Sequence, residues 1–212
     1  WVQATEQSAN PAVRQREYTL MLRQSGKEYR PIRAKALQGV VALHLERGEH
    51  EAFPALLKQA EIKADRQSVL ENWLAALEQE PDAGKRAKGY GQILPHLKSS
   101  ARREPVVSWL DSHYRQHGQH EALLQLWEQE LPRYRNRPEQ ARLITFGLGQ
   151  HCLEQLPKDD CAQRWLLETD GGGVSTVELE ARLLLSQTEQ AAGRIPEATQ
   201  TLQPVVQRPL PS

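Results

Sequence analysis

The chain has 212 residues, of which 39% are hydrophobic and 25% are charged, proportions typical of ordinary soluble proteins. Its 27 basic residues equal its 27 acidic residues, so its formal net charge is zero. This balance argues against a dedicated nucleic-acid or anionic-membrane binder, which normally carries a basic excess. No apolar run approaches the roughly 18–20 residues that a membrane span needs.

The N-terminal part is predicted to hold one helix and a partial repeat. Residues 11–24 begin at Asn10-Pro11 and carry Val13, Leu20 and Met21. Residues 1–8 are interpreted as the remnant of a partner helix, so we expect residues 1–31 to form an N-terminal helix or partial repeat. No signal-peptide pattern opens the sequence. We interpret the chain as a mature product or the soluble part of a longer or anchored protein, with cytoplasm and periplasm both open.

Helical hairpins are predicted along the rest of the chain, because glycines recur at a regular interval. Gly48, Gly84, Gly118 and Gly193 are separated by 36, 34 and 75 residues, and Pro157 divides the last gap. Apolar residues flank these breakers at three- and four-residue steps, as in Leu37, Val40, Val41 and His44 before Gly48 and Phe53, Leu56, Leu57 and Ala60 after it. Such spacing gives each helix one apolar face. A lone hairpin cannot bury two such faces, so neighbouring hairpins must stack.

This pattern resembles the tetratricopeptide repeat, a helix–turn–helix unit of about 34 residues. With the glycines in the turns, the family's large position in the first helix falls on Leu37, Trp73, Val107 and Arg182. The match is good at Trp73 and poor at Arg182. Related helical-repeat families of similar period remain open.

The resemblance implies an all-α fold, a right-handed α-solenoid of stacked antiparallel helix pairs. The array would cover residues 32–207 in about four to five pairs, and residues 208–212 would form a C-terminal tail. Pro204 and the prolines after it are expected to end the last helix. The glycines that follow Asp170 are interpreted as a hinge between repeats.

Candidate chemical sites are few. His113 and His117 are one helical turn apart and, with His120, form the best metal-like cluster; the alternative is a helix C-terminus, where histidine is favourable. Cys152 and Cys161 would lie on facing helices, where a disulfide and two buried thiols are both open. No cofactor and no catalytic residue is predicted.

Glycine and arginine motifs are interpreted as structural. Gly89-Tyr90-Gly91 and Gly171-Gly172-Gly173 lack the rest of a nucleotide-binding motif. The basic clusters at residues 85–88, 102–103 and 133–137 are interpreted as solvated turns, although a tyrosine among arginines could stack a base. Most tryptophans are predicted to be core.

A concave groove lined by the first helix of each pair is what the resemblance implies for function. In this register the groove residues are Lys35, Gln38, Glu71, Glu78, Ser108, Ser112, Arg115 and Gln187. Because their charges are mixed, we expect a neutral or amphipathic partner segment rather than an acidic tail.

Three functions stay open from sequence. The first is a non-enzymatic scaffold that holds another protein or peptide segment, with no nucleic acid expected. The second is an RNA-binding helical repeat, which zero net charge disfavours. The third is a metal-binding domain centred on His113 and His117.

Overall fold

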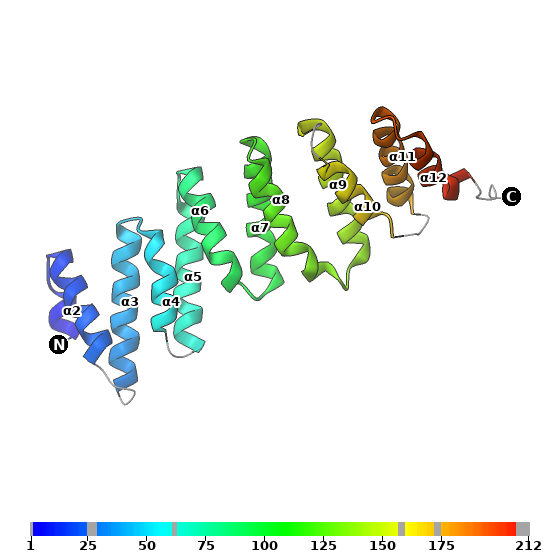
Figure 1. Ribbon diagram of the computed structural model, residues 1–212. Helices are drawn as coiled ribbons and strands as arrows, with labels where there is room; N and C mark the ends of the chain where they lie inside the picture. Colours follow the sequence, from blue (N-terminus) through cyan, green and yellow to red (C-terminus); the bar gives the residue numbers. More distant parts are fainter. Residues whose placement is uncertain (1, 25–28, 61–62, 157–159, 172–174, 207–212) are drawn as a thin grey trace. The chain divides into compact units, whose positions relative to one another are not determined.

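The computed structural model describes residues 2–24, 29–60, 63–156, 160–171 and 175–206. Within these ranges the chain is helical and contains no strand (Figure 1). The α-helices are α1 (Val2–Glu6), α2 (Pro11–Gln24), α3 (Arg30–Glu46), α4 (Phe53–Gln59), α5 (Lys63–Gln79), α6 (Ala83–Ile93), α7 (Ser100–Gln116), α8 (His120–Glu130), α9 (Pro138–Gln155), α10 (Cys161–Thr169), α11 (Thr176–Ala191) and α12 (Ile195–Val206). Short 3-10 turns η2 (His50–Ala52), η3 (Leu94–His96) and η4 (Leu131–Tyr134) lie between them.

The chain divides into two compact units, residues 1–117 with α1 to α7 and residues 118–212 with α8 to α12. None of the helices in the described part of the chain combines the length and apolar character that a membrane span requires.

The first unit packs successive helices around a core of large side chains. Contacts join α2 to α3, α3 to α5, α4 to α5, α5 to α6 and α6 to α7. Trp73 of α5 is fully buried and stacks on Phe53 of α4, with ring centroids 4.9 Å apart. Leu37 and Val107, at the same register position as Trp73, are also buried. The apolar spacing in the sequence therefore locates the buried faces correctly.

Two helix ends are set by glycine in the left-handed backbone region. Gly48 follows α3 with φ 64°, and Gly193 follows α11 with φ 76°. Each turn carries the same pair of bonds: after α3, the Gly48 N–H donates to the Leu45 carbonyl at 3.0 Å and the Glu49 N–H to the His44 carbonyl at 2.9 Å. This is the Schellman arrangement, in which a positive φ favours glycine. Gly118, which follows α7, also has a positive φ of 62°.

The predicted turn at Gly84 is wrong. Gly84 lies in the first turn of α6, which begins at Ala83 with Asp82 as its N-cap. The Asp82 carboxylate accepts a bond from the Lys85 N–H at 2.9 Å, and an N-terminal cap of this kind needs no glycine. The break between α5 and α6 is therefore made by Pro81 and Asp82.

The second unit is built on contacts of α9 with α10 and α11, of α10 with α11, and of α11 with α12. Its core joins Leu166 of α10 to Ala181 and Leu185 of α11. Arg182, the poorest match to the repeat pattern, is buried as well. Its guanidinium donates to both oxygens of Asp170, at 2.6 and 2.9 Å, so a charge pair replaces the expected apolar contact.

The C-terminal helix corrects a second prediction. Helix α12 runs through Pro204 to Val206, whereas Pro204 was expected to end it. Proline removes one N–H donor, but the last turn of a helix can lose one bond and continue to the next residues. The predicted tail at residues 208–212 and the glycines at 172 and 173 lie outside the described residues.

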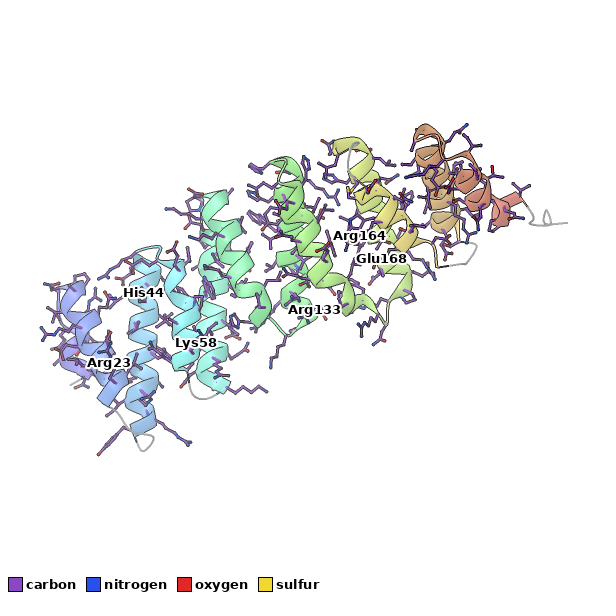
Figure 2. The ribbon with its side chains drawn as sticks, in the orientation of Figure 1. Arg23, His44, Lys58, Arg133, Arg164 and Glu168 are labelled. Carbon is purple, nitrogen blue, oxygen red and sulfur yellow. A yellow bond between two sulfur atoms is a disulfide. The ribbon has the colours of Figure 1, made fainter. Side chains whose placement is uncertain are left out.

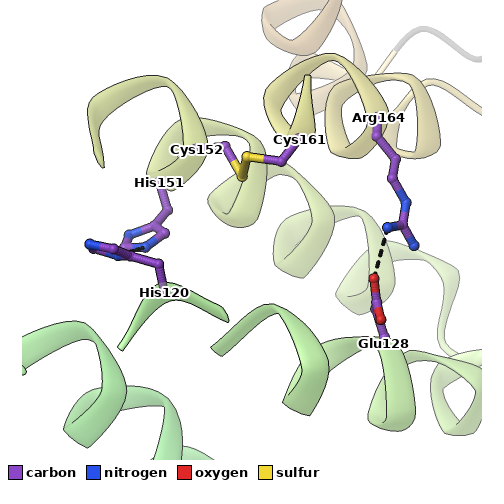
Figure 3. The surroundings of a disulfide bond; sticks show 6 residues. All are labelled: His120, Glu128, His151, Cys152, Cys161 and Arg164. Atoms are coloured by element: carbon purple, nitrogen blue, oxygen red, sulfur yellow. Dashed lines mark hydrogen bonds and ion pairs between the residues drawn. A yellow bond between two sulfur atoms is a disulfide. The ribbon is translucent and has the colours of Figure 1, made fainter. Parts of the chain in front are cut away.

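A disulfide joins Cys152, near the end of α9, to Cys161, the first residue of α10 (Figure 3). The two Cα atoms are 5.9 Å apart. Of the two alternatives left open for these cysteines, the structure contains the disulfide. The bond covalently links α9 and α10, the two helices that make the most extensive contact in this unit.

Candidate functional site

Helix α3 exposes a single stripe of side chains. Lys35, Gln38, Ala42 and Glu46 are exposed at three- and four-residue steps, while Ala36, Leu37, Val40, Val41 and Leu43 are buried. The rest of the helix is covered because α3 contacts α2 and α5. Any partner of α3 must therefore approach along this stripe, which contains the predicted groove residues Lys35 and Gln38.

The next predicted groove residues lie on α5 and α7 of the same unit. Glu71, Glu78, Ser108 and Ser112 are exposed, as a groove requires. Arg102 of α7 donates to the Glu71 carboxylate at 2.7 Å and so bridges the two helices. Hydrogen bonds, first from Gln67 and then from Arg102, hold the pKa of Glu71 below its usual value.

Arg115 is the predicted groove residue that fits least well. Its guanidinium donates to both carboxylate oxygens of Asp111, at 2.8 and 3.3 Å, one turn back on α7. The side chain is half-buried and its charge is matched. Because Asp111 already neutralises its charge, Arg115 would attract an acidic group of a partner less strongly than an unpaired cation would.

Helix α11 carries the corresponding stripe in the second unit. The exposed residues are Thr176, Glu180, Leu183, Gln187 and Gln190, again at three- and four-residue steps. Leu183 is 49% exposed. Helix α11 contacts α9, as α5 contacts α3 in the first unit. The structure thus places seven predicted groove residues on the first unit and Gln187 on the second.

The histidine cluster does not assemble into a metal site. The His113 and His117 rings are 4.2 Å apart, but the His117 Nδ1–H donates to the His113 carbonyl at 2.8 Å. His120 instead bonds His151, with 3.0 Å between Nδ1 and Nε2 (Figure 3). Across the described residues, no group of three or more His, Cys, Asp or Glu side chains could hold a metal ion.

Two of the three basic clusters are tied to structural partners. The Arg103 side chain is buried and donates to the carbonyls of Leu94 and Leu97. Arg86 lies over the ring of Trp109, with 4.9 Å from its guanidinium carbon to the ring centroid. These arginines hold helices together, and this use of their charge was not predicted from the sequence.

The third cluster borders a cavity of about 590 Å³ in the second unit. Tyr134 and Arg135 line it from η4 and the residue after it, Arg142 and Thr145 from α9, and Arg164, Trp165 and Glu168 from α10. Figure 2 shows Arg164 and Glu168 one turn apart on α10. A volume of this size is within the range of small-ligand pockets.

Charges around the cavity are largely paired. Arg164 donates to Glu128 at 2.7 Å (Figure 3), and its guanidinium lies 5.1 Å from the Trp165 ring centroid. Arg142 donates to Glu139 at 2.7 Å and lies 3.3 Å from Glu178. These pairs neutralise two of the cavity's three arginines.

Sequence reasoning missed this cavity. It singled out Tyr134 and Arg135 as part of a basic cluster but gave no role to Arg142, Arg164 or Glu168. The one local signal in the region is Ser175-Thr176-Val177-Glu178, a capping box that opens α11. Its Glu178 is the same carboxylate that faces Arg142.

Comparison with known proteins adds little. No protein-family model and no curated protein matches the chain. Among solved structures, the crystal structure of BtubC (BKLC) from P. vanneervenii is similar with a TM-score of 0.39 and 13% identity, over 97% of this chain and 96% of that chain. Similarity at this level does not establish a shared fold.

Proposed function

We propose that the chain is a non-enzymatic protein–protein interaction scaffold, a tetratricopeptide-like solenoid that holds a partner segment in its concave groove. The observation that carries the proposal is the single exposed stripe on each of α3 and α11. A helix buried on its other faces can offer a partner only that stripe. In a stack of hairpins such stripes lie next to one another and form a continuous surface.

The composition of the stripes favours a neutral or amphipathic segment. Among the predicted groove residues of the first unit, Glu71 and Glu78 outnumber Lys35, and Arg115 is paired with Asp111, so this groove has no cluster of cations for an acidic tail. The stripe of α11 combines Leu183 with glutamines. Such a surface suits a helix or extended chain that buries apolar side chains and hydrogen-bonds along its length.

The test compares two matched double variants of the whole chain. Lys35→Glu with Gln38→Glu changes the stripe of α3, whereas Lys58→Glu with Gln59→Glu makes the same chemical change on exposed positions of α4. Circular dichroism must first show equal helicity. Each protein is then used as bait in lysate from cells that make it, and the captured protein is identified and titrated.

We expect the α3 variant to weaken binding of a specific captured protein by on the order of tenfold, while the α4 variant binds as the wild type does. Equal binding by both variants would reject the groove. Nuclease-sensitive RNA that copurifies in place of protein would support the RNA-binding alternative, and stoichiometric metal would support the metal-binding one.

A further inference from the structure

The cavity of the second unit lies outside the proposed groove. None of the eight predicted groove residues lines it, and its walls come from α8, η4, α9 and α10. It therefore needs its own explanation.

Among the described residues that line this cavity, one cation and one anion have no ion-pair partner. Arg135 and Glu168 are exposed lining residues, and neither forms an ion pair with another described residue. The other arginines are matched by Glu128, Glu139 and Glu178. A ligand that complements this cavity carries both a negative and a positive group. A nucleic-acid strand fits poorly, because its phosphates would approach Glu128 and Glu168.

The uncharged part of the lining suits a peptide. Leu131, Pro132 and Tyr134 supply apolar and aromatic surface. The ring of Tyr134 packs against the ring of Trp127, with ring centroids 6.2 Å apart. Arg164 engages Glu128 through Nη1, and a guanidinium has further N–H donors that can bond the carbonyls of an extended chain.

We propose that this cavity binds a short peptide segment of a partner protein, with an acidic side chain against Arg135, a basic side chain against Glu168 and an apolar side chain against Leu131 and Pro132. The inference rests on the proposed function, since it gives the same scaffold a second binding site.

The probes are fluorescein-labelled, N-acetylated peptide amides with the cores Glu-Leu-Lys, Lys-Leu-Glu, Glu-Leu-Gln, Gln-Leu-Lys and Gln-Leu-Gln between glycines. Fluorescence anisotropy measures their binding to the full chain. We expect one of the two doubly charged peptides to bind about five- to tenfold more tightly than either singly charged one. Arg135→Gln should remove the advantage of the glutamate, and Glu168→Gln that of the lysine.

The controls are Glu154→Gln, an exposed residue of the same unit that does not line the cavity, and Arg23→Gln, an exposed residue of α2 in the first unit, and both should leave binding unchanged. Equal binding of all five peptides, or no binding at millimolar protein, would overturn the proposal. So would tight binding of labelled oligouridylate that Arg135→Gln abolishes, which would make the ligand RNA.

The same two experiments separate this inference from the proposed function. If no peptide binds the cavity while the α3 variant still loses affinity for a captured protein, this inference alone is wrong. If a peptide binds the cavity while the α3 variant binds the captured protein as tightly as the wild type does, the proposed groove alone is wrong.

Discussion

His113 is a buried histidine within a row of aromatic contacts on α7. Its ring stacks on Trp109, with centroids 4.9 Å apart and planes within 9°, and it lies beside His117. Burial, and then the neighbouring imidazole, lowers the pKa of His113 below its usual 6.5. The neutral ring is therefore favoured in the folded protein.

This shift predicts how the stability of the first unit depends on pH. Well above pH 6.5 the ring is neutral in both the folded and unfolded states, and the full stability is present. As the pH falls below 6.5, the unfolded chain takes up a proton that the folded one resists, so the free energy of unfolding decreases. His113→Phe keeps the stacking on Trp109 and should lose less stability between pH 7 and pH 5.

Thermal melts at several pH values measure this effect. The control is His96→Gln, because His96 is an exposed histidine of η3 and its loss should leave the wild-type pH dependence intact. Identical pH profiles for His113→Phe and the wild type would show that the ring does not titrate as described.

Helix α6 shows why a glycine motif can be structural. A Cβ built at Gly89 would overlap Cδ2 of Leu77, a fully buried side chain of α5, whereas a Cβ at Gly91 meets nothing within 4 Å. Gly89 thus lets α5 and α6 approach closely. Gly91 only lowers helix propensity.

The two glycines give opposite predictions for the same substitution. Gly89→Ala should destabilise the chain by about 1–3 kcal/mol, because Leu77 must leave its position in the core. Gly91→Ala should stabilise it by about 0.5–1 kcal/mol, because alanine favours the helix and fits. Urea unfolding measures both, and a stabilising Gly89→Ala would contradict the packing of α5 on α6.

At the scale of elements, sequence periodicity predicted the helices well and their boundaries less well. Helix α2 spans residues 11–24 as expected, and left-handed glycines follow α3, α7 and α11. Gly84 was wrongly expected in a turn, and Pro204 was wrongly expected to end α12, because the type of a residue alone does not determine its position relative to a helix end. A capping aspartate made the turn before Gly84. Pro204 falls late enough in α12 to be tolerated.

For the whole molecule, the cavity could not be predicted because its walls come from elements spread over residues 128–171. Local patterns carry no information about which charges pair across such distances. The exposed stripes, by contrast, can be predicted from local sequence. Apolar residues at three- and four-residue steps identify the buried face of a helix, and the opposite face must then be exposed to solvent. The predicted groove residues on α3, α5, α7 and α11 are accordingly on the surface, apart from the half-buried Arg115.

The disulfide predicts an effect limited to one unit of the molecule. Cys152 and Cys161 are nine residues apart, so breaking their bond releases a small loop and should cost about 2–3 kcal/mol. Because the bond lies within residues 118–212, tris(2-carboxyethyl)phosphine should weaken hydrogen-exchange protection of α9 and α10 and spare residues 1–117.

Mass spectrometry of exchanging amides resolves the two regions. The double variant Cys152→Ala with Cys161→Ala supplies the control, because its exchange should not respond to the reductant. Loss of protection in residues 1–117 to the same extent as in α9 and α10 would refute a local role for the disulfide.

The narrow exposed stripe on α11 also bears on how this chain can change over evolutionary time. Residues 176, 180, 183, 187 and 190 face solvent while the buried residues between them hold the helix in place. Substitutions at the exposed positions alter what a partner meets without creating a cavity or an unpaired charge in the core, so most of them cost little stability. Under the proposed function, the choice of partner can therefore change in single steps while the fold is kept under separate selection, and one helical framework can serve many successive partners.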